Sequence, residues 1–316
     1  MDPSDKSVVV ERNSSWRSLY PFTSHFMQLG PLRYHYLDEG KSSGTREVLL
    51  MVHGNPTWSF YWRNLILALR ERYRIIAVDH IGCGLSDKPA AYPYTLSQHI
   101  DNLLACIDQL GIHSITLFGH DWGGAIGLGA AVRRPELFAR FVLFNTGAFP
   151  PPRVPRRIAA CRIPWLGEWG VRRLNLFAWG ALHMATEAPQ GLRGAVRDGI
   201  LAPYDSWENR IGIHRFVCDI PFTRKHPTYA VLDDIERRLP ELGRHASQFI
   251  WGMRDWCFTP ACLERLLPAF PTAEVHRLTD AGHWVVEDAI DRVIPLVQSF
   301  LERHPLATLP PEGQKP

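Results

Sequence analysis

The chain has 316 residues, of which 46% are hydrophobic and 21% are charged, and its formal net charge is +3. These values are typical of a globular protein and exclude a disordered chain, a collagen and a coiled coil. The small net charge and the lack of long Lys/Arg runs indicate that no nucleic acid is bound. Eleven tryptophans indicate a large apolar pocket or a lid over one.

The charge is unevenly distributed along the chain. Residues 150–225 carry a formal charge of +6, whereas the remaining residues sum to −3. A solvated helical surface explains this excess. The alternative is that the basic segment contacts an anionic substrate, an acidic partner enzyme or a membrane surface.

The sequence also indicates a cellular compartment. The first sixteen residues lack the apolar core of a signal peptide, and no apolar run reaches the roughly 18 residues of a membrane span. The six cysteines form no Cys-x-x-Cys pair and no metal-ligand pattern. We therefore expect a soluble, cytoplasmic protein with free thiols, no metal and no cofactor.

The first half of the chain alternates between predicted strands and predicted helices. Gly30-Pro31 indicates a hairpin over residues 25–37. Apolar runs predict buried strands, and helical spacing predicts helices over 96–110 and 123–133. This alternation predicts a mostly parallel sheet covered on both faces. The buried strands are expected at 48–52, 73–78, 114–118 and 138–144.

A helical segment interrupts the alternation. Strand and helix signals resume only at 249–252, so the sequence predicts a core domain, residues 1–147 and 226–316, and a helical cap, residues 148–225, inserted after the sixth strand. Six aromatic residues of the cap are candidates for lining a pocket, with packing between cap and core as the alternative. They are Trp165, Trp169, Phe177, Trp179, Trp207 and Phe216.

A short motif predicts the nucleophile. Gly119-His120-Asp121-Trp122-Gly123 joins a predicted strand to a predicted helix with the spacing of the Gly-x-Ser-x-Gly turn of α/β-hydrolases. Asp121 stands where serine is usual. A carboxylate suits displacement of a leaving group from saturated carbon, which gives an alkyl-enzyme ester. Water would then attack the ester carbonyl of Asp121.

A histidine and a second acid complete a predicted triad. His283 follows the last predicted strand and is the candidate base that activates water. Asp255 is the better candidate for the acid that orients His283, because Asn145, at the end of the strand before it, is uncharged. The order Asp121, Asp255, His283 is that of α/β-hydrolases. Two acids that precede the nucleophile remain as alternatives, Asp79 and Asp87.

Two neutral donors are candidates for holding the leaving group. Trp122 follows the nucleophile and offers an indole N–H, and Asn55 follows the strand at 48–52 and offers an amide N–H. Neutral donors without a nearby cation suit a weakly hydrated anion such as chloride or bromide.

Together these residues resemble the haloalkane dehalogenase branch of the α/β-hydrolase superfamily, over about residues 25–303. This resemblance implies the same roles for the three triad residues and the two donors. The predicted acid, Asp255, follows the core strand that comes after Asn145. This placement resembles the type III branch of the family, and that resemblance implies self-association. The motifs are HGNPTW (53–58), DHIGCGLSDKP (79–89), GHDWGG (119–124), WGMRD (251–255) and DAGHW (280–284).

The cap resembles a second group. Four of its segments look like OleB proteins, for which the resemblance implies decarboxylation of cis-β-lactones to olefins. We therefore predict a small apolar substrate and haloalkane dehalogenation, with β-lactone decarboxylation as the alternative. The segments are AFPPP (148–152), LGEW (166–169), APYDSWENRI (202–211) and RFVCDIPF (215–222).

Two other functions are weaker alternatives. An epoxide hydrolase needs two cap tyrosines, and only Tyr204 lies between residues 150 and 225. A non-catalytic ligand-binding protein of this fold would usually lack a triad residue, whereas all three positions are filled here.

Overall fold

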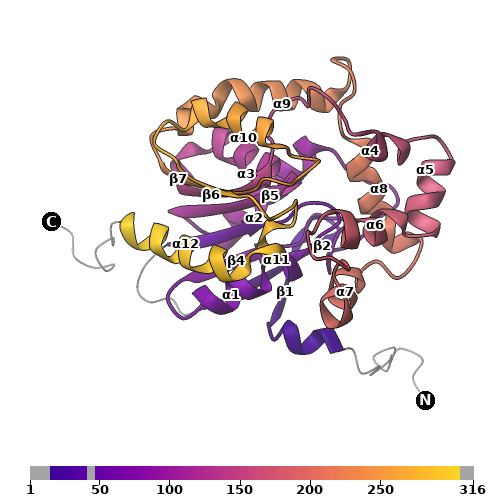
Figure 1. Cartoon of the computed structure of the whole chain (residues 1–316), viewed down its shortest axis with the longest axis horizontal. Helices are drawn as coiled ribbons and strands as arrows, with labels where there is room; N and C mark the ends of the chain where they lie inside the picture. The colour runs from indigo at the N-terminus through magenta and orange to yellow at the C-terminus, as the bar shows by residue number, and fades with distance from the viewer. Residues whose placement is uncertain (1–14, 41–46, 307–316) are drawn as a thin grey trace.

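The computed structural model describes residues 15–40 and 47–306, and its centre is one eight-stranded sheet (Figure 1). The strand order is β1-β2-β4-β3-β5-β6-β7-β8. β1 and β2 form an antiparallel hairpin, β2 runs antiparallel to β4, and the other neighbours are parallel. The strands are β1 (Ser24–Leu29), β2 (Leu32–Glu39), β3 (Val48–Val52), β4 (Arg74–Val78), β5 (Ile115–Asp121), β6 (Phe138–Thr146), β7 (Ala246–Gly252) and β8 (Glu274–Leu278).

Helices cover both faces of the sheet. In Figure 1, α2, α3, α9 and α10 lie on one side, and α1, α11 and α12 lie on the other. This arrangement buries every residue of β3, which explains why that strand is a continuous apolar run. The helices are α1 (Arg63–Leu69), α2 (Leu96–Leu110), α3 (Trp122–Arg133), α4 (Arg156–Ala160), α5 (Leu166–Glu168), α6 (Leu176–Met184), α7 (Gly194–Leu201), α8 (Ile211–Cys218), α9 (Pro227–Arg238), α10 (Pro260–Leu266), α11 (Val285–Asp288) and α12 (Ile290–Arg303).

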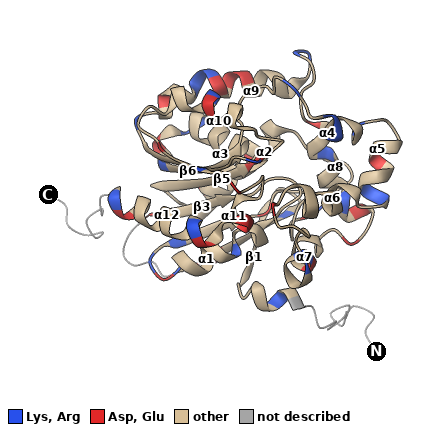
Figure 2. Ribbon diagram, in the orientation of Figure 1, with Lys and Arg blue, Asp and Glu red and all other residues tan. Residues whose placement is uncertain are grey.

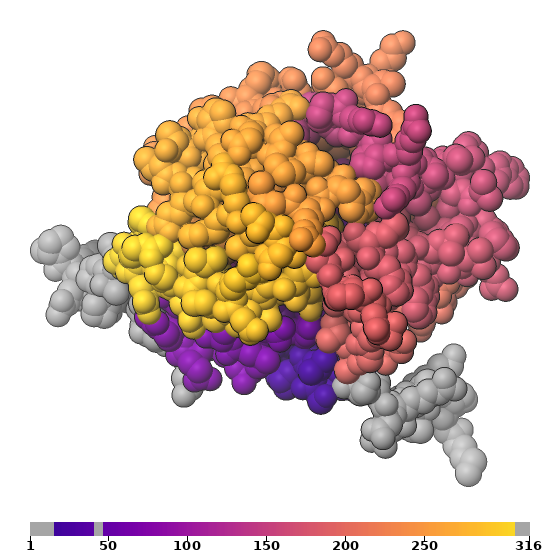
Figure 3. Space-filling model, in the orientation of Figure 1, coloured from indigo at the N-terminus to yellow at the C-terminus, as the bar shows by residue number. Residues whose placement is uncertain are grey.

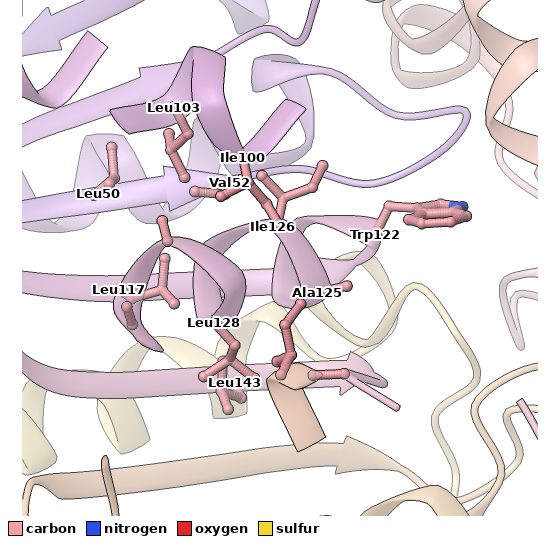
Figure 4. Packing of buried hydrophobic residues seen from close by; sticks show 14 of the residues in the cluster. Leu50, Val52, Ile100, Leu103, Leu117, Trp122, Ala125, Ile126, Leu128 and Leu143 are labelled. Carbon is pink, nitrogen blue, oxygen red and sulfur yellow. The ribbon is translucent and has the colours of Figure 1, made fainter. Parts of the chain in front are cut away.

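The side chains of β3 alternate between two hydrophobic clusters. Leu49 and Met51 join the cluster beneath α1 and α12, whereas Leu50 and Val52 join the one beneath α2 and α3. Figure 4 shows part of the second cluster, where α3 packs on β5 and β6 and Trp122 points away from the other labelled residues. The core therefore fixes the position at which α3 begins.

The cap segment between β6 and α9 is helical, with α4 to α8 and a π-helical turn at Trp169–Arg173. It forms one end of the molecule, beside the C-terminal part of the core (Figure 3). Hydrogen bonds tie it to core loops: the indole N–H of Trp58 donates to the Gly199 carbonyl at 3.0 Å, and the Tyr204 hydroxyl donates to the Thr57 carbonyl at 3.2 Å. The cap is therefore anchored on the core at several points.

The predicted architecture, a mostly parallel sheet with helices on both faces, is confirmed, and so is the hairpin. β5 and β6 run slightly further than predicted, to Asp121 and Thr146. Their last residues pair with each other after a register shift, and polar side chains there conceal the strand signal. No helix in the described ranges is long and apolar enough to span a bilayer. The predicted absence of a signal peptide concerns the first sixteen residues, of which residues 1–14 lie outside the described residues.

Candidate active site

Asp121 lies in a sharp turn between β5 and α3. Its φ and ψ are 53° and −128°, a conformation that non-glycine residues rarely adopt. The turn also needs space: a Cβ atom on Gly123 would lie 2.0 Å from the carbonyl oxygen of Val52. The spacing of the motif at 119–123 is thus explained by a strained turn packed tightly against β3.

Two backbone N–H groups point at the Asp121 carboxylate. The N–H of Asn55 donates to Asp121 Oδ1 at 2.8 Å, and the N–H of Trp122 also bonds to this carboxylate. Burial raises the pKa of Asp121 above its ordinary value, against the lowering effect of His283 and of these two donors. The same N–H groups are placed to stabilise negative charge that develops on an ester of Asp121.

The structure brings His283 and Asp255 to the nucleophile. His283 donates from Nδ1 to Asp255 Oδ2 at 2.8 Å, and its Nε2 lies 3.6 Å from Asp121 Oδ2. Burial alone would lower the pKa of His283, but the Asp255 carboxylate, with further help from Asp121, raises it above its ordinary value. The three predicted triad residues are thus adjacent, in the order expected for such a triad.

Asn145 supports the acid, a role that the sequence did not reveal. Its Nδ2 donates to Asp255 Oδ2 and to the Gly252 carbonyl, both at 3.0 Å, and its Oδ1 accepts from the Gly252 N–H at 2.8 Å. The N–H of Cys257 donates to the other Asp255 oxygen at 2.6 Å. Both Asp255 oxygens therefore accept hydrogen bonds, which fix the orientation of this side chain beside His283.

The two other acids that were considered have different partners. Asp79 is fully buried beside His35 at 2.8 Å and accepts from the Ser59 N–H at 2.7 Å. Asp87 bonds to Arg33 near the surface. Neither is within hydrogen-bonding distance of His283, so both alternatives are wrong.

The two predicted leaving-group donors line the same cavity as Asp121. Asn55 donates one amide hydrogen to the Ile213 carbonyl at 3.1 Å, which leaves its second amide hydrogen for a ligand. Within the described part of the chain, the indole N–H of Trp122 has no hydrogen-bond partner. Both donors are thus free to bind a departing anion.

The cavity has a volume of about 690 Å³, within the usual range of ligand sites. Its walls come from the core and from the cap, and most of its lining is apolar. Of the six cap aromatics predicted to line it, only Phe177 does. Trp165, Trp169 and Trp179 are exposed, and Trp207 and Phe216 pack against other side chains. Cap helices are short, so their apolar residues do not define a single inward face.

The described residues contain no cluster of three or more His, Cys, Asp or Glu side chains placed to hold a metal ion. Nor does any tyrosine of the described ranges line the cavity. Tyr204 is buried, and its hydroxyl donates to the Thr57 carbonyl instead. An epoxide hydrolase, which needs tyrosine donors in the cavity, is therefore disfavoured.

The chain is similar to known proteins of two kinds. Over 298 residues, 92% of each chain, the sequence is 41% identical to a cis-3-alkyl-4-alkyloxetan-2-one decarboxylase from Shewanella oneidensis. It is 32% identical to haloalkane dehalogenase 2 from Mycobacterium tuberculosis over 280 residues, 87% of this chain and 93% of that one. The crystal structure of the haloalkane dehalogenase DatA from Agrobacterium tumefaciens has a similar fold, with a TM-score of 0.79 at 24% identity, covering 89% of this chain and 96% of that one.

The sequence also matches the family of the alpha/beta hydrolase fold over residues 47–290, which is most of the chain. This match, the sheet order and the turn that carries Asp121 lead to one conclusion. The protein belongs to the α/β-hydrolase fold family, among enzymes related to haloalkane dehalogenases and β-lactone decarboxylases.

Proposed function

We propose that this protein is a cis-β-lactone decarboxylase, which converts a lactone with two alkyl substituents into an olefin and carbon dioxide. The observation that carries this choice is the 41% identity to a decarboxylase along nearly the whole chain, against 32% to a dehalogenase. Haloalkane dehalogenation, the first expectation from the sequence, becomes the second candidate.

The first step uses Asp121 as the nucleophile. Its carboxylate attacks the saturated ring carbon that bears the ring oxygen, and that carbon–oxygen bond breaks. The products are an ester of Asp121 and a free carboxylate on the former lactone carbonyl. Asn55 and Trp122 supply N–H donors for the negative charge that develops on this departing group.

The second step releases the olefin. The bond between the substrate's carboxylate and its neighbouring carbon breaks, and its electron pair forms the double bond. At the same time the carbon–oxygen bond to Asp121 breaks and returns an electron pair to the Asp121 carboxylate. No water is consumed. The raised pKa of His283 supports a positive charge 3.6 Å from the departing Asp121 carboxylate, which favours this step.

The cavity supports an apolar substrate. Phe149, Phe177, Ile220, Leu232 and Phe258 are among its lining residues, and its volume is about 690 Å³. Burial of each methylene group contributes about 0.8 kcal/mol, so long alkyl chains would bind well there.

The test compares two substrate classes with the same protein. Purified enzyme is incubated with a synthetic cis-3,4-dialkyl β-lactone and, separately, with 1-bromobutane or 1,2-dibromoethane. Gas chromatography measures the olefin, and halide release measures dehalogenation. We expect olefin from the lactone, little halide release, and no product with Asp121→Ala. Rapid halide release without olefin would contradict the proposal.

Dehalogenation remains the second candidate because the Asn55 and Trp122 donors also suit a halide. Labelled water separates the two chemistries. In dehalogenation, water attacks the ester carbonyl of Asp121, so heavy oxygen from the solvent enters this carboxylate during turnover. In the proposed decarboxylation the carboxylate keeps its own oxygen atoms. Mass spectrometry of the peptide that contains Asp121 distinguishes the two outcomes.

A further inference from the structure

Exposed apolar side chains are concentrated on one part of the cap. Of the eleven large apolar residues that the described ranges expose, eight fall between positions 163 and 184. Solvent-exposed groups of this size are uncommon on soluble proteins and usually mark an interaction site. Six of them, on or directly beside α5, the π-helical turn and α6, define the apolar cap face: Trp165, Leu166, Trp169, Leu174, Leu176 and Trp179.

Trp165 is the most prominent residue of the apolar cap face. Its side chain is 89% exposed, and its φ and ψ are 64° and −54°. The Leu166 N–H donates to the Pro164 carbonyl at 2.7 Å, so Trp165 is the central residue of a strained γ-turn. Folding gains little from an exposed indole on a strained backbone, which indicates that the ring has a partner outside the chain.

Arginines flank the apolar cap face in the sequence. Residues 153–176 contain six arginines and one acid, Glu168, and Glu168 already pairs with Arg172 at 2.6 Å. The blue residues on α4 and beside α5 in Figure 2 belong to this group. In the part of the chain that the structure describes, the other five have no carboxylate within ion-pair distance. They are the cap arginines: Arg153, Arg156, Arg157, Arg162 and Arg173.

The apolar cap face is continuous with the entrance to the cavity. Leu176 belongs both to this face and to the cavity lining, and Met184, at the other end of α6, is also exposed and lines the cavity. Three cap arginines, at positions 153, 156 and 157, line the cavity as well. Whatever covers the apolar cap face therefore lies next to the route into the active site.

We propose that the apolar cap face, together with the cap arginines, docks on the surface of an anionic lipid bilayer. Exposed tryptophans favour the interface between headgroups and acyl chains, and arginines are attracted to anionic headgroups. A second copy of the chain fits less well. A two-fold contact would set the same face against itself and bring the unpaired cap arginines together.

The first test is cosedimentation with vesicles. Wild-type protein should bind vesicles of phosphatidylcholine mixed with phosphatidylglycerol, and should bind pure phosphatidylcholine at least about fivefold more weakly. Trp165→Ser/Leu166→Ser should weaken binding about tenfold or more. The matched control is Phe26→Ser/Leu67→Ser, which removes two exposed apolar residues on β1 and α1 and should bind like wild type.

The second test concerns charge and does not depend on the apolar substitutions. Arg173→Gln should lower binding about fivefold, whereas Arg244→Gln, an exposed arginine outside the cap, should change it little. High salt should weaken wild-type binding. Thermal melting checks that every variant is folded.

Two results would overturn the proposal. One is that wild-type protein fails to bind the anionic vesicles. The other is that Trp165→Ser/Leu166→Ser binds vesicles normally but loses a self-association that sedimentation velocity detects in the wild type. In that case the apolar cap face is an interface between copies of the chain.

Discussion

Asn145 offers a sharp test of how the catalytic acid is held. The Asn145→Ala substitution removes the two hydrogen bonds that this side chain donates, to Asp255 and to the Gly252 carbonyl, and the one that it accepts from the Gly252 N–H. Asn145 is fully buried and does not line the cavity. The substitution therefore changes the support of Asp255 without touching the substrate.

The hydrogen bonds that Asn145→Ala removes determine how far stability and kcat should fall. The Gly252 N–H loses its buried partner, at about 1–3 kcal/mol. The Gly252 carbonyl keeps the Asp255 N–H at 3.3 Å and loses only one hydrogen bond, at about 0.5–1.5 kcal/mol, so we expect a loss of about 2–4 kcal/mol in the free energy of unfolding. The hydrogen bond to the charged Asp255 contributes about 1.5–3 kcal/mol. If this contribution orients His283 in the transition state, kcat falls roughly 10- to 100-fold. KM should stay within about twofold.

Steady-state kinetics and thermal melting measure the two effects separately. The matched control is Asn102→Ala, which removes another largely buried asparagine. It lies on α2, bonds to Gln98 and Tyr92, and does not line the cavity. This control should lower Tm without changing kcat. If Asn145→Ala lowers Tm but leaves kcat within about twofold of wild type, Asn145 serves only the backbone of Gly252 and the reasoning is refuted.

Three further predictions concern the indole donor Trp122, the turn that carries Asp121 and the buried carboxyl group of Asp79. Trp122→Phe removes the indole N–H from the cavity, and we expect kcat for either leaving group to fall about 100-fold or more in steady-state assays. Gly123→Ala would place Cβ 2.0 Å from the Val52 carbonyl, so the soluble yield or the melting temperature should fall sharply. Burial alone would raise the pKa of Asp79, but His35 and nearby donors lower it to about 2. Its stabilising contribution, about 2 kcal/mol, is therefore present above about pH 4 and is lost towards about pH 2, and Asp79→Asn should remove most of this slope in denaturant titrations.

The sequence predicted those parts of the site that short-range signals specify. An apolar run that ends at Gly119 and a glycine-rich helical segment after it predicted the turn that carries Asp121. These two signals lie within about twenty residues of each other. The positions of Asp255 and His283 followed from their places after predicted strands, since parallel strands present their carboxyl ends at one edge.

The role of Asn145 could not be predicted from the sequence. The sequence indicates only that this residue is uncharged and cannot serve as the acid. Its contact with Asp255 joins positions 110 residues apart, and it depends on the pairing of β6 with β7. An asparagine at the end of a strand gives no signal of whether its amide binds a ligand or holds a neighbouring carboxylate.

The prediction that six cap aromatics line the cavity was wrong for five of them, for a different physical reason. Tryptophan and phenylalanine are apolar on any surface that excludes water, so composition indicates contact but not its partner. Phe177 faces the cavity, whereas Trp179, two residues further along α6, is exposed. Residues two apart on a helix point in different directions, and a helix of nine residues is too short to define a dominant face.

The choice between the two chemistries cannot reside in the triad. Attack by Asp121 on saturated carbon is common to both, and the two reactions diverge only after the ester forms. An ester that carries a neighbouring carboxylate can expel carbon dioxide, whereas an ester without one must wait for water. The substrate itself therefore decides the outcome, and selectivity depends on which molecules reach Asp121. That places the selection in the cavity wall and its entrance, where the cap residues Phe177 and Leu176 lie. A cap that rests on a bilayer would draw long-chain lactones from the lipid phase, and substitutions there should change substrate preference while leaving the triad geometry intact.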